Sequence, residues 1–543
     1  MRRPAGQKEG RRDRSPASPW WRAVAAPAAG ALPALCFPAP ALWWPAYFVL
    51  VPWLALLASA ATPRRAALEG WLGGTGFMLA MHHWLLPSLH VFLLVLGALL
   101  GALWAPWGLL VRDLLRGRPG PARCAAALLL VPSGWLLIEL VRSWEYLGGP
   151  WGVFGASQWQ VAPALRLASL GGVWLLTLLL VAVNTALTAL LLSPAARRTA
   201  LGGLLAVAVA AGAAWAWAPR PEPAGTARIA VVQAGVVVGP DARFARGEQP
   251  TRTLKGRGVD LVVWGESSVG ADLTRRPDLR ARLAALAREV DTDLLVNVDA
   301  RRADRPGIYK SSVLIGPDGP TGDRYDKMRL VPFGEYVPAR SILGWATSVG
   351  KAATEDRHRG TRQVVMATGP VSSPDLRFGP LVCFETAFPD MSRRLVRDGA
   401  GLLVAQSATS SFQESWAPEQ HASLAALRAA ETWRPMVHAT LTGVSAVHGP
   451  DGAPVGEPLG TDRVTAAVYT VPLAHGTSPY VRFGDWPLYV ALLALAGYCL
   501  RTGVRALRPP SARAPGDRSP GLPVRPPATR TLRFLRRPGP TPR

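Results

Sequence analysis

The stretch YDKMRLVPFGEYVP, residues 325–338, lies in the middle of a region where short β-branched runs alternate with polar and helical segments. Such runs occur at 228–233 (RIAVVQ), 260–264 (DLVVW), 293–298 (DLLVNV), 311–315 (SSVLI), 379–384 (GPLVCF), 401–405 (GLLVA), 436–440 and 464–471. Helical patterns separate several of them, as at 278–290 and 419–433. This alternation is typical of a layered α/β domain, and we expect residues 226–474 to form one such domain with its own core.

Three residues with useful chemistry stand at or just after predicted strand ends in this region. Glu266 follows the run VVWG, Lys327 belongs to the quoted stretch, and Cys383 ends the run LVC. A thiol becomes a good nucleophile when a base takes its proton, and a cation can hold the charge that develops on the attacked carbonyl. An inert buried thiol is the alternative. The acid and the lysine favour a nucleophilic cysteine.

Long apolar blocks make up much of the remaining chain. The 543 residues are 49% hydrophobic and only 18% charged, with a mean hydropathy of +0.16, which fits neither an ordinary soluble domain nor a disordered basic chain. Blocks long enough to cross a bilayer as helices lie at 20–37, 40–60, 67–86, 89–111, 124–141, 165–192, 200–218 and 485–503. We expect eight spans: a seven-span region at 20–218 and a final helix at 485–503. A buried soluble bundle is the alternative.

Basic residues orient the predicted bundle. They precede the first block, follow the last, and lie in alternate connections, as Arg64 and Arg65, then Arg112, Arg116, Arg118 and Arg123, then Arg197 and Arg198. The connections at 38–40 and 87–90 contain no Lys or Arg, and the aromatic-rich 142–166 connection has only Arg142 and Arg166, at its edges. By the positive-inside rule, both termini are cytoplasmic and the α/β domain is extracytoplasmic. The net charge of +24 is thus largely a membrane-topology signal, and we expect no nucleic-acid partner.

Both ends of the chain are basic. Residues 1–19 form the predicted cytoplasmic N-terminus. A signal peptide is the alternative there, but no small-x-small cleavage site follows the first apolar block and six more spans do, so we predict an uncleaved anchor. Residues 504–543, rich in Arg, Pro and Gly, are predicted to be a disordered cytoplasmic tail held near anionic lipid.

The residues of the α/β region are similar to those of a known superfamily. Glu266, the quoted block with Lys327, and Cys383-Phe384-Glu385 look like the Glu-Lys-Cys triad of the nitrilase (carbon–nitrogen hydrolase) superfamily. With seven predicted spans before that domain and one after it, residues 20–503 resemble the apolipoprotein N-acyltransferase family. The segment PYVRFGD at 479–485 is similar to that family's re-entry segment. The resemblance implies a nitrilase-like αββα sandwich on the outer side of the bacterial cytoplasmic membrane.

The resemblance also implies a reaction and a role for each site residue. Cys383 would attack an acyl ester of a membrane phospholipid, and the thioester would pass its acyl chain to the N-terminal amine of a diacylglyceryl-cysteine lipoprotein. Glu266 would be the general base and Lys327 the oxyanion stabiliser. Glu335 and Glu385 match supporting acids, for each of which a structural ion pair is the alternative. No cofactor and no metal are expected, and we expect a monomer.

Three positions depart from the family pattern. Gly265 stands before Glu266 where Pro is common, and Phe384 follows the nucleophile where Tyr is common. Neither change removes a catalytic group. The stretch QSATSSF at 406–412 replaces a family loop that contains Asn-Asp and Trp-Phe near the substrate cleft. We expect this loop to affect the choice of acyl chain or acceptor, or the level of activity.

Other groups of residues suggest weaker alternatives. His82, His83 and His90 could suggest a metal, but no carboxylate is close in sequence, which favours an interfacial role. A further trio, His421, His438 and His448, could serve Cys383 as in a Cys-His protease, which the Glu and Lys motifs make unnecessary.

The aromatic connection at 144–159 is either an interfacial element or an aromatic belt. Two other functions stay open: a membrane-tethered nitrilase-type amidase, in which water replaces the amine, and a diverged paralogue or scaffold.

Overall fold

The computed structural model describes residues 19–344, 355–369 and 376–507. The predicted cytoplasmic N-terminus and the predicted Arg-rich tail therefore lie outside the described residues, except for Pro19 and the residues from Val504 to Leu507. The chain divides into two compact units, Met1–Ala496 and Gly497–Arg543. The predicted seven-span region and the α/β domain both belong to the first unit.

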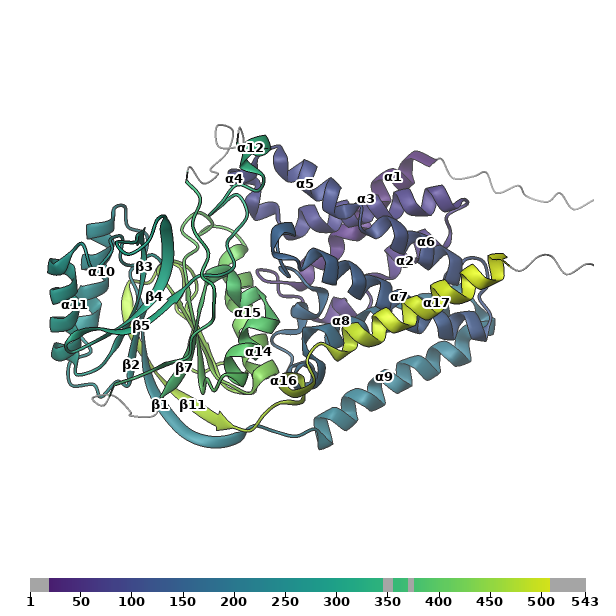
Figure 1. Cartoon of the computed structure of the whole chain (residues 1–543). Coiled ribbons are helices and arrows are strands. Elements are labelled where there is room, and N and C mark those ends of the chain that lie inside the picture. The colour runs from purple at the N-terminus through teal and green to yellow at the C-terminus, as the bar shows by residue number, and fades with distance from the viewer. Residues whose placement is uncertain (1–18, 345–354, 370–375, 508–543) are drawn as a thin grey trace, which may run out of the picture. The chain divides into compact units, whose positions relative to one another are not determined.

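The N-terminal part of this unit is helical (Figure 1). Its helices are α1 (Pro19–Ala31), α2 (Val51–Ala58), α3 (Pro63–Met81), α4 (Leu86–Leu89), α5 (Phe92–Gly101), α6 (Trp104–Leu115), α7 (Pro121–Arg142), α8 (Ala162–Leu192) and α9 (Arg197–Trp217). Short 3-10 turns link them: η1 (Leu32–Cys36), η2 (Trp44–Tyr47), η3 (His83–Leu85), η4 (Glu145–Leu147), η5 (Phe154–Gln158) and η6 (Pro194–Ala196). After the α/β domain come α16 (Pro479–Phe483) and α17 (Trp486–Leu507).

Five helical segments of the described chain are long and apolar enough to cross a membrane. They are 92–115, 121–142, 162–192, 194–217 and 486–504. The predicted span at 20–37 is instead a short α-helix that tightens into a 3-10 turn, with Pro27 inside the helix and Pro33 in the turn. The predicted span at 40–60 forms η2 and the eight-residue α2, each of which has a proline in its first turn. The apolar pattern therefore locates the helices better than it predicts their lengths.

Helix α8 is broken in its first half, where the sequence predicts one continuous span. Gly171 and Gly172 leave the helical conformation, and Gly172 has a φ of 68°. A Cβ on Gly172 would lie 2.6 Å from the ring of Tyr480. The amide of Val173, which begins the second half, donates a 2.8 Å hydrogen bond to Glu431 Oε1 from the α/β domain. The break thus creates a second helix N-terminus at Val173, and a residue of the α/β domain binds to it.

The bundle also holds the 144–159 connection in place. Trp53, Trp104, Trp107 and Trp135 are buried and pack edge-to-face, with ring centroids 5.2–5.9 Å apart. Trp135 donates a 2.8 Å hydrogen bond to Glu139, whose same oxygen accepts one of 2.7 Å from the amide of Phe154. The tryptophan cluster therefore positions a chain segment that leads towards the α/β domain.

The α/β domain contains two sheets. The first has the order β11-β1-β2-β3-β4-β5, from β1 (Glu222–Gln233), β2 (Leu261–Trp264), β3 (Leu294–Arg301), β4 (Ile308–Gly316), β5 (Gly319–Asp326) and β11 (Thr465–His475). The second has the order β10-β9-β8-β7-β6, from β6 (Met366–Ala367), β7 (Arg377–Val382), β8 (Leu402–Ser407), β9 (Met436–Thr440) and β10 (Ala446–His448). The inner strands β1 to β3 and β7 to β9 are parallel, and their partners towards the edges are antiparallel.

Two hydrophobic cores define four layers. The core between the sheets contains buried residues from both, including Ile229, Val263, Phe378 and Val404. The second core lies between the first sheet and the helices α10 (Pro240–Arg252) and α11 (Pro277–Val290). Helices α14 (Pro389–Arg397) and α15 (Ala417–Thr432) contact the second sheet. The domain is therefore an αββα sandwich, the architecture that the resemblance implies.

Two strand predictions differ from the structure near the predicted site. Strand β7 ends at Val382, so Cys383 and Phe384 begin the 3-10 turn η7 (Cys383–Ala387) instead of extending the strand. Strand β5 is absent from the sequence-based prediction because its residues, GPTGDRYD, are polar and rich in turn formers. It forms as a partly exposed edge strand paired with β4.

Candidate active site

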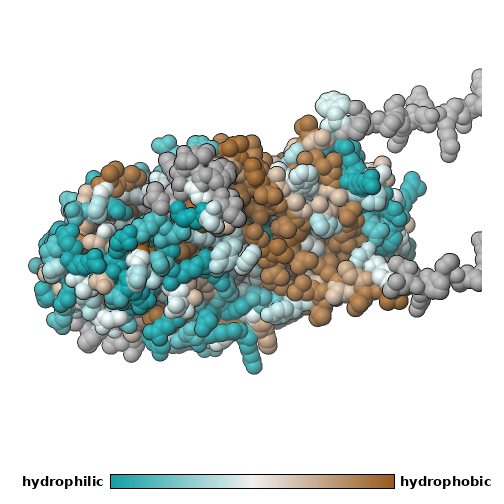
Figure 2. Space-filling view, turned by 45° about the horizontal axis from the view of Figure 1, so that its top comes forward, coloured by the Kyte–Doolittle hydropathy of each residue, from teal (hydrophilic) through white to brown (hydrophobic). Residues whose placement is uncertain are grey.

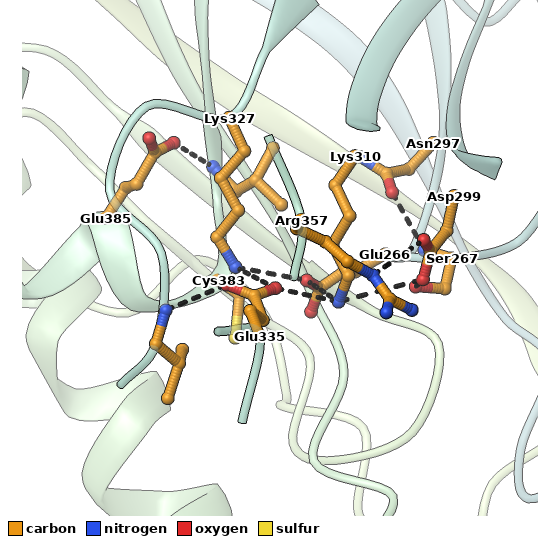
Figure 3. Close-up of polar contacts among 12 residues, drawn as sticks. Glu266, Ser267, Asn297, Asp299, Lys310, Lys327, Glu335, Arg357, Cys383 and Glu385 are labelled. Carbon is orange, nitrogen blue, oxygen red and sulfur yellow. Dashed lines mark hydrogen bonds and ion pairs between the residues drawn. The ribbon is translucent and has the colours of Figure 1, made fainter. Parts of the chain in front are cut away.

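The predicted base, cation and nucleophile come together at the ends of three strands. Glu266 lies just after β2, Lys327 directly after β5 and Cys383 directly after β7. Figure 3 shows the Cys383 sulfur beside the Lys327 ammonium group and the carboxylates of Glu266 and Glu335. The ends of β2 and β5 in the first sheet and of β7 in the second sheet thus contribute to one site.

Cys383 occupies a strained turn. It has a φ of +53°, a conformation that non-glycine residues rarely adopt. Its carbonyl oxygen lies 3.0 Å from His421 Nε2, and the side chain is only partly buried. Burial and the nearby Glu266 raise the pKa of the thiol to about 12, against the opposing effect of Lys327. The resting residue is therefore a thiol that needs a base before it can attack.

Glu266 is buried and ionised. Burial raises the pKa of its carboxyl group, but the positive charges of Lys310 and Lys327 outweigh burial and leave the pKa below its usual value. The Lys327 Nζ lies 3.3 Å from Glu266 Oε1. The backbone amide of Glu266 donates a 3.1 Å hydrogen bond to the carbonyl of Ser407 at the end of β8. The second sheet therefore helps to fix the predicted base.

Gly265, the departure just before Glu266, has a steric explanation. A Cβ at this position would lie 1.8 Å from the amide nitrogen of Leu441 and 2.4 Å from the carbonyl carbon of Thr440. The chain beyond β9 therefore approaches the end of β2 so closely that only glycine fits without a backbone shift.

Substituting Gly265 with alanine is expected to destabilise the domain by about 3 kcal/mol, because overpacking here must move backbone on both sheets. The midpoint of thermal unfolding should fall by about 8 °C, measured on the full chain in detergent. Displacement of Glu266 should slow acyl transfer at least ~10-fold. The matched control is Gly401→Ala, whose added Cβ would meet nothing closer than an oxygen at 3.4 Å. Equal behaviour of the two variants would contradict this explanation.

Lys327 is fully buried and held by two acids. Its Nζ lies 2.8 Å from Glu335 Oε1 as well as 3.3 Å from Glu266. The other oxygen of Glu335 accepts a 2.8 Å hydrogen bond from the amide of Val331. Burial raises the pKa of Glu335, but the two lysines outweigh it and lower the value to about 2. Glu335 therefore forms an ion pair with Lys327, one of the three predicted site residues.

Glu385 forms a different kind of link. Its Oε1 accepts hydrogen bonds from the Tyr325 hydroxyl at 2.7 Å, the Met328 amide at 2.8 Å and the Arg329 amide at 3.0 Å. Its Oε2 accepts one of 2.8 Å from the amide of Val382, the residue before Cys383. Burial raises the pKa of this carboxyl group against these donors. Glu385 thus ties the Lys327 loop to the turn that carries Cys383.

A second lysine in the site is missing from the sequence-based prediction. Lys310 of β4 places its Nζ 2.8 Å from Glu266 Oε1 and 3.0 Å from Glu335 Oε1 (Figure 3). One signal was available in the sequence: only five residues are lysine, whereas nearly all other basic residues are arginine. Two of those five lie in this site. A compact ammonium group with three donors can serve several acceptors that a planar guanidinium cannot.

The divergent stretch 406–412 has a mainly structural first half. Gln406 Nε2 donates to the carbonyls of Trp264 at 2.8 Å and Leu295 at 3.2 Å, so it joins the two sheets. Thr409 bonds the carbonyl of Thr442 through both its amide and its hydroxyl. Only the end of the stretch reaches the bundle, where the Phe412 ring lies 4.9 Å from that of Trp84.

The 144–159 connection contacts the α/β domain beside Cys383. Trp151 donates a 2.9 Å hydrogen bond to Gln420, and its ring lies 5.4 Å from that of His421. A Cβ on Gly149 would lie 2.6 Å from the ring of Phe384. Glu145 forms a 2.5 Å ion pair with Arg359. The connection is therefore part of the surroundings of the site, which goes beyond an aromatic belt.

Four of the histidines, His82, His83, His421 and His448, contact backbone carbonyl oxygens, whereas both ring nitrogens of His438 have no hydrogen-bond partner among the described residues. His421 reaches the Cys383 carbonyl oxygen rather than its sulfur, and burial lowers its pKa to about 4. A Cys-His pair is therefore not the arrangement found. His82 and His83 bond carbonyls in or beside their own helix, at Met78 and Ala80. The described residues contain no group of three or more His, Cys, Asp and Glu side chains placed to hold a metal ion.

Comparisons with known proteins match both parts of the chain. The carbon-nitrogen hydrolase family model matches residues 228–477, and the model of the apolipoprotein N-acyltransferase N-terminal domain matches residues 29–186. Among solved structures, a mutant of the amidase from Nesterenkonia sp. AN1 is 19% identical and aligns with 50% of this chain and 98% of its own, with a TM-score of 0.35.

Curated relatives match over nearly their whole length. The apolipoprotein N-acyltransferase of Geobacter metallireducens is 31% identical over 87% of this chain and 94% of its own. That of Azotobacter vinelandii is 31% identical over 91% of this chain and 98% of its own. The chain therefore belongs to the apolipoprotein N-acyltransferase family of enzymes.

Proposed function

We propose that this enzyme transfers an acyl chain from a membrane phospholipid to the N-terminal amine of a diacylglyceryl-cysteine lipoprotein, through a thioester on Cys383. The observation that carries the proposal is the arrangement of Cys383 on a strained turn beside buried Glu266 and Lys327. A nucleophile, a base and a cation within one buried cluster are the groups that acyl transfer needs. Membership of the apolipoprotein N-acyltransferase family supports a lipoprotein amine as the acceptor.

The first half-reaction loads the enzyme. Glu266 accepts the proton of the Cys383 thiol as the sulfur attacks the ester carbonyl carbon and forms the S–C bond. The carbonyl oxygen becomes an oxyanion, which the Lys327 ammonium group stabilises. The C–O ester bond then breaks, and Glu266 returns the proton to the leaving oxygen. The products are a thioester on Cys383 and a lysophospholipid.

The second half-reaction uses the amine of the lipoprotein. Its nitrogen attacks the thioester carbonyl and passes a proton to Glu266, and the C–S bond breaks to leave an amide. The thiolate takes the proton back from Glu266, so the cycle closes without a cofactor. Glu335 acts through Lys327 by holding its ammonium group, and Glu385 acts by fixing the two loops that carry Lys327 and Cys383.

We also propose the membrane arrangement that this chemistry needs: eight spans, both termini in the cytoplasm and the catalytic domain on the outer side of the bacterial cytoplasmic membrane. Figure 2 shows hydrophobic residues gathered on the helical part and hydrophilic ones on the α/β domain. Large apolar side chains on α5, α9 and α17 are exposed, including Leu99, Leu205 and Leu493. Exposed aliphatic helix faces support contact with lipid, and the alternating basic connections support the orientation. We propose that the enzyme acts as a monomer.

The proposed function is tested with a phospholipid that carries a tagged acyl chain, mixed with the full chain in micelles. The tag should appear on the protein and be released by neutral hydroxylamine, because thioesters react with this nucleophile far faster than oxygen esters. Adding a synthetic diacylated lipopeptide should move the tag to its N-terminal amine, as mass spectrometry would detect. Release of the tag as free acid with the peptide present would instead identify a hydrolase. No labelling at all would contradict the proposed donor.

A further inference from the structure

Lys310 occupies a position between three acidic side chains. It extends from β4, and its side chain is 14% exposed. Its Nζ lies 2.8 Å from Glu266 Oε1, 3.0 Å from Glu335 Oε1 and 4.0 Å from Asp299 Oδ2. Asp299 has a cation of its own, since Arg357 Nε lies 3.4 Å away, and it also accepts a 3.1 Å hydrogen bond from Ser267. The two acids that Lys310 serves most closely are therefore Glu266 and Glu335.

The charges of this cluster depend on Lys310. Glu266 and Glu335 each direct Oε1 at the same two ammonium groups, those of Lys310 and Lys327. Two carboxylates and two ammonium groups give a neutral cluster in which both acids stay ionised. With Lys327 alone, two neighbouring buried carboxylates would share one cation, and such pairs retain a proton to higher pH. The groups facing Glu266 are thus Lys310, Lys327, Glu335 and Cys383.

We infer that Lys310 is a positioning residue that keeps the base Glu266 ionised and ready to accept the thiol proton in acidic conditions. This inference rests on the proposed role of Glu266 in acyl transfer. When Glu266 takes the proton from Cys383, the neutral cluster gains one positive charge at the moment when the substrate oxygen becomes negative. Lys310 therefore also makes the cluster electrostatically complementary to the tetrahedral intermediate, although it need not touch that intermediate.

The lowered pKa of Glu266 and the value of about 2 for Glu335 agree with this geometry. A group whose pKa is depressed in the folded protein loses its charge only as the pH falls through that depressed value. Activity that needs ionised Glu266 should therefore persist at acidic pH in the native enzyme. Removing the Lys310 charge should shift the acid limb of the pH–activity profile to higher pH, by about one pH unit or more.

The test compares Lys310→Met with the native chain, because methionine keeps much of the length without the charge. We expect the acid-side apparent pKa for acyl transfer from the tagged phospholipid to rise by about one unit or more, so that at a pH below both acid limbs the variant is at least ~10-fold slower than the native chain. Lys310→Arg restores the positive charge, so its acid limb should lie close to that of the native chain. Its planar group cannot reproduce the contacts with both Glu266 and Glu335, so acyl transfer by this variant should remain slower than in the native chain. The matched control is Lys255→Met, which removes an exposed lysine from the same domain and should leave the limb in place.

A second measurement works without any lipid substrate. Iodoacetamide alkylates Cys383, and mass spectrometry of the peptide that contains this residue gives its rate at each pH. Because Glu266 assists removal of the thiol proton, the acid limb of alkylation should move upward in Lys310→Met as it does for acyl transfer. If the native chain transfers no acyl group, the proposed function fails while alkylation still decides the role of Lys310.

Loss of rate by the same factor at every pH, with the acid limb unmoved, would overturn the inference and leave Lys310 as a packing residue. The same conclusion would follow if Lys310→Arg shifted the limb as far as Lys310→Met. Should Lys310→Met fail to fold, Lys310→Gln is measured in its place, since the amide can still donate to one carboxylate.

Discussion

Replacing Cys383 with alanine is expected to abolish acyl transfer, reducing it at least ~10⁴-fold, because no bond to the enzyme can then form. The same variant should take up no tagged acyl chain from phospholipid. The fold should survive, since the side chain is only partly buried and alanine is the smaller residue. The expected result is a folded protein without labelling and, in cells that lack a paralogue, lipoproteins whose N-terminal amines remain free, as mass spectrometry of one native lipoprotein would show.

Cys499→Ala is the matched control for this experiment. Cys499 is an exposed cysteine on α17, so its loss should change neither labelling nor transfer. A second variant, Cys383→Ser, keeps a nucleophilic atom but with a far less acidic hydroxyl, so any acyl group that it accepts should resist hydroxylamine. Unchanged lipoprotein N-acylation by Cys383→Ala would show that the chemistry occurs elsewhere, and it would remove the basis of the proposed mechanism.

The sequence predicts Glu266, Lys327 and Cys383 as site residues because each belongs to a recognisable motif, and Glu266 and Cys383 also follow hydrophobic runs. The sequence also predicts the αββα architecture, and the structure brings the three predicted side chains together. The count of long apolar helices was harder to predict. Proline positions shorten two of the predicted spans, and the glycine pair in α8 breaks another, because packing partners far away in sequence accept these irregularities.

What the sequence does not show depends on contacts between distant segments. Gly265 is explained by the backbone at Thr440 and Leu441, which lies far along the chain and approaches only after both sheets form. Lys310 lies near the start of β4, just before the predicted run at 311–315, and belongs to no motif. The amides that bind Glu385 carry no signal in the sequence, because every residue except proline has one. The roles of these residues therefore arise only when the chain is folded.

The role of Glu385 leads to the second large expected effect. Glu385→Ala should destabilise the domain by about 4 kcal/mol and slow acyl transfer at least ~10²-fold. The substitution leaves the buried amide of Val382 and the partly buried amides of Met328 and Arg329 without their acceptor, and an unsatisfied buried donor costs about 1–3 kcal/mol. The midpoint of thermal unfolding should fall by about 12 °C in detergent, and the remaining folded protein should be slow because Lys327 and Cys383 are no longer held in register.

Glu385→Gln tests the hydrogen bonds that join the two loops separately from the negative charge of the side chain. The amide has one acceptor oxygen, so it can satisfy either the Lys327 loop or the amide of Val382, and the other side must face an NH₂ group. We therefore expect stability and rate between those of the native chain and Glu385→Ala. Glu457→Ala, at an exposed glutamate of the same domain, is the matched control and should change neither quantity. If Glu385→Ala lost activity with no loss of stability, the four hydrogen bonds would not be the reason for this residue, and a direct part in proton transfer would have to replace the bridging role.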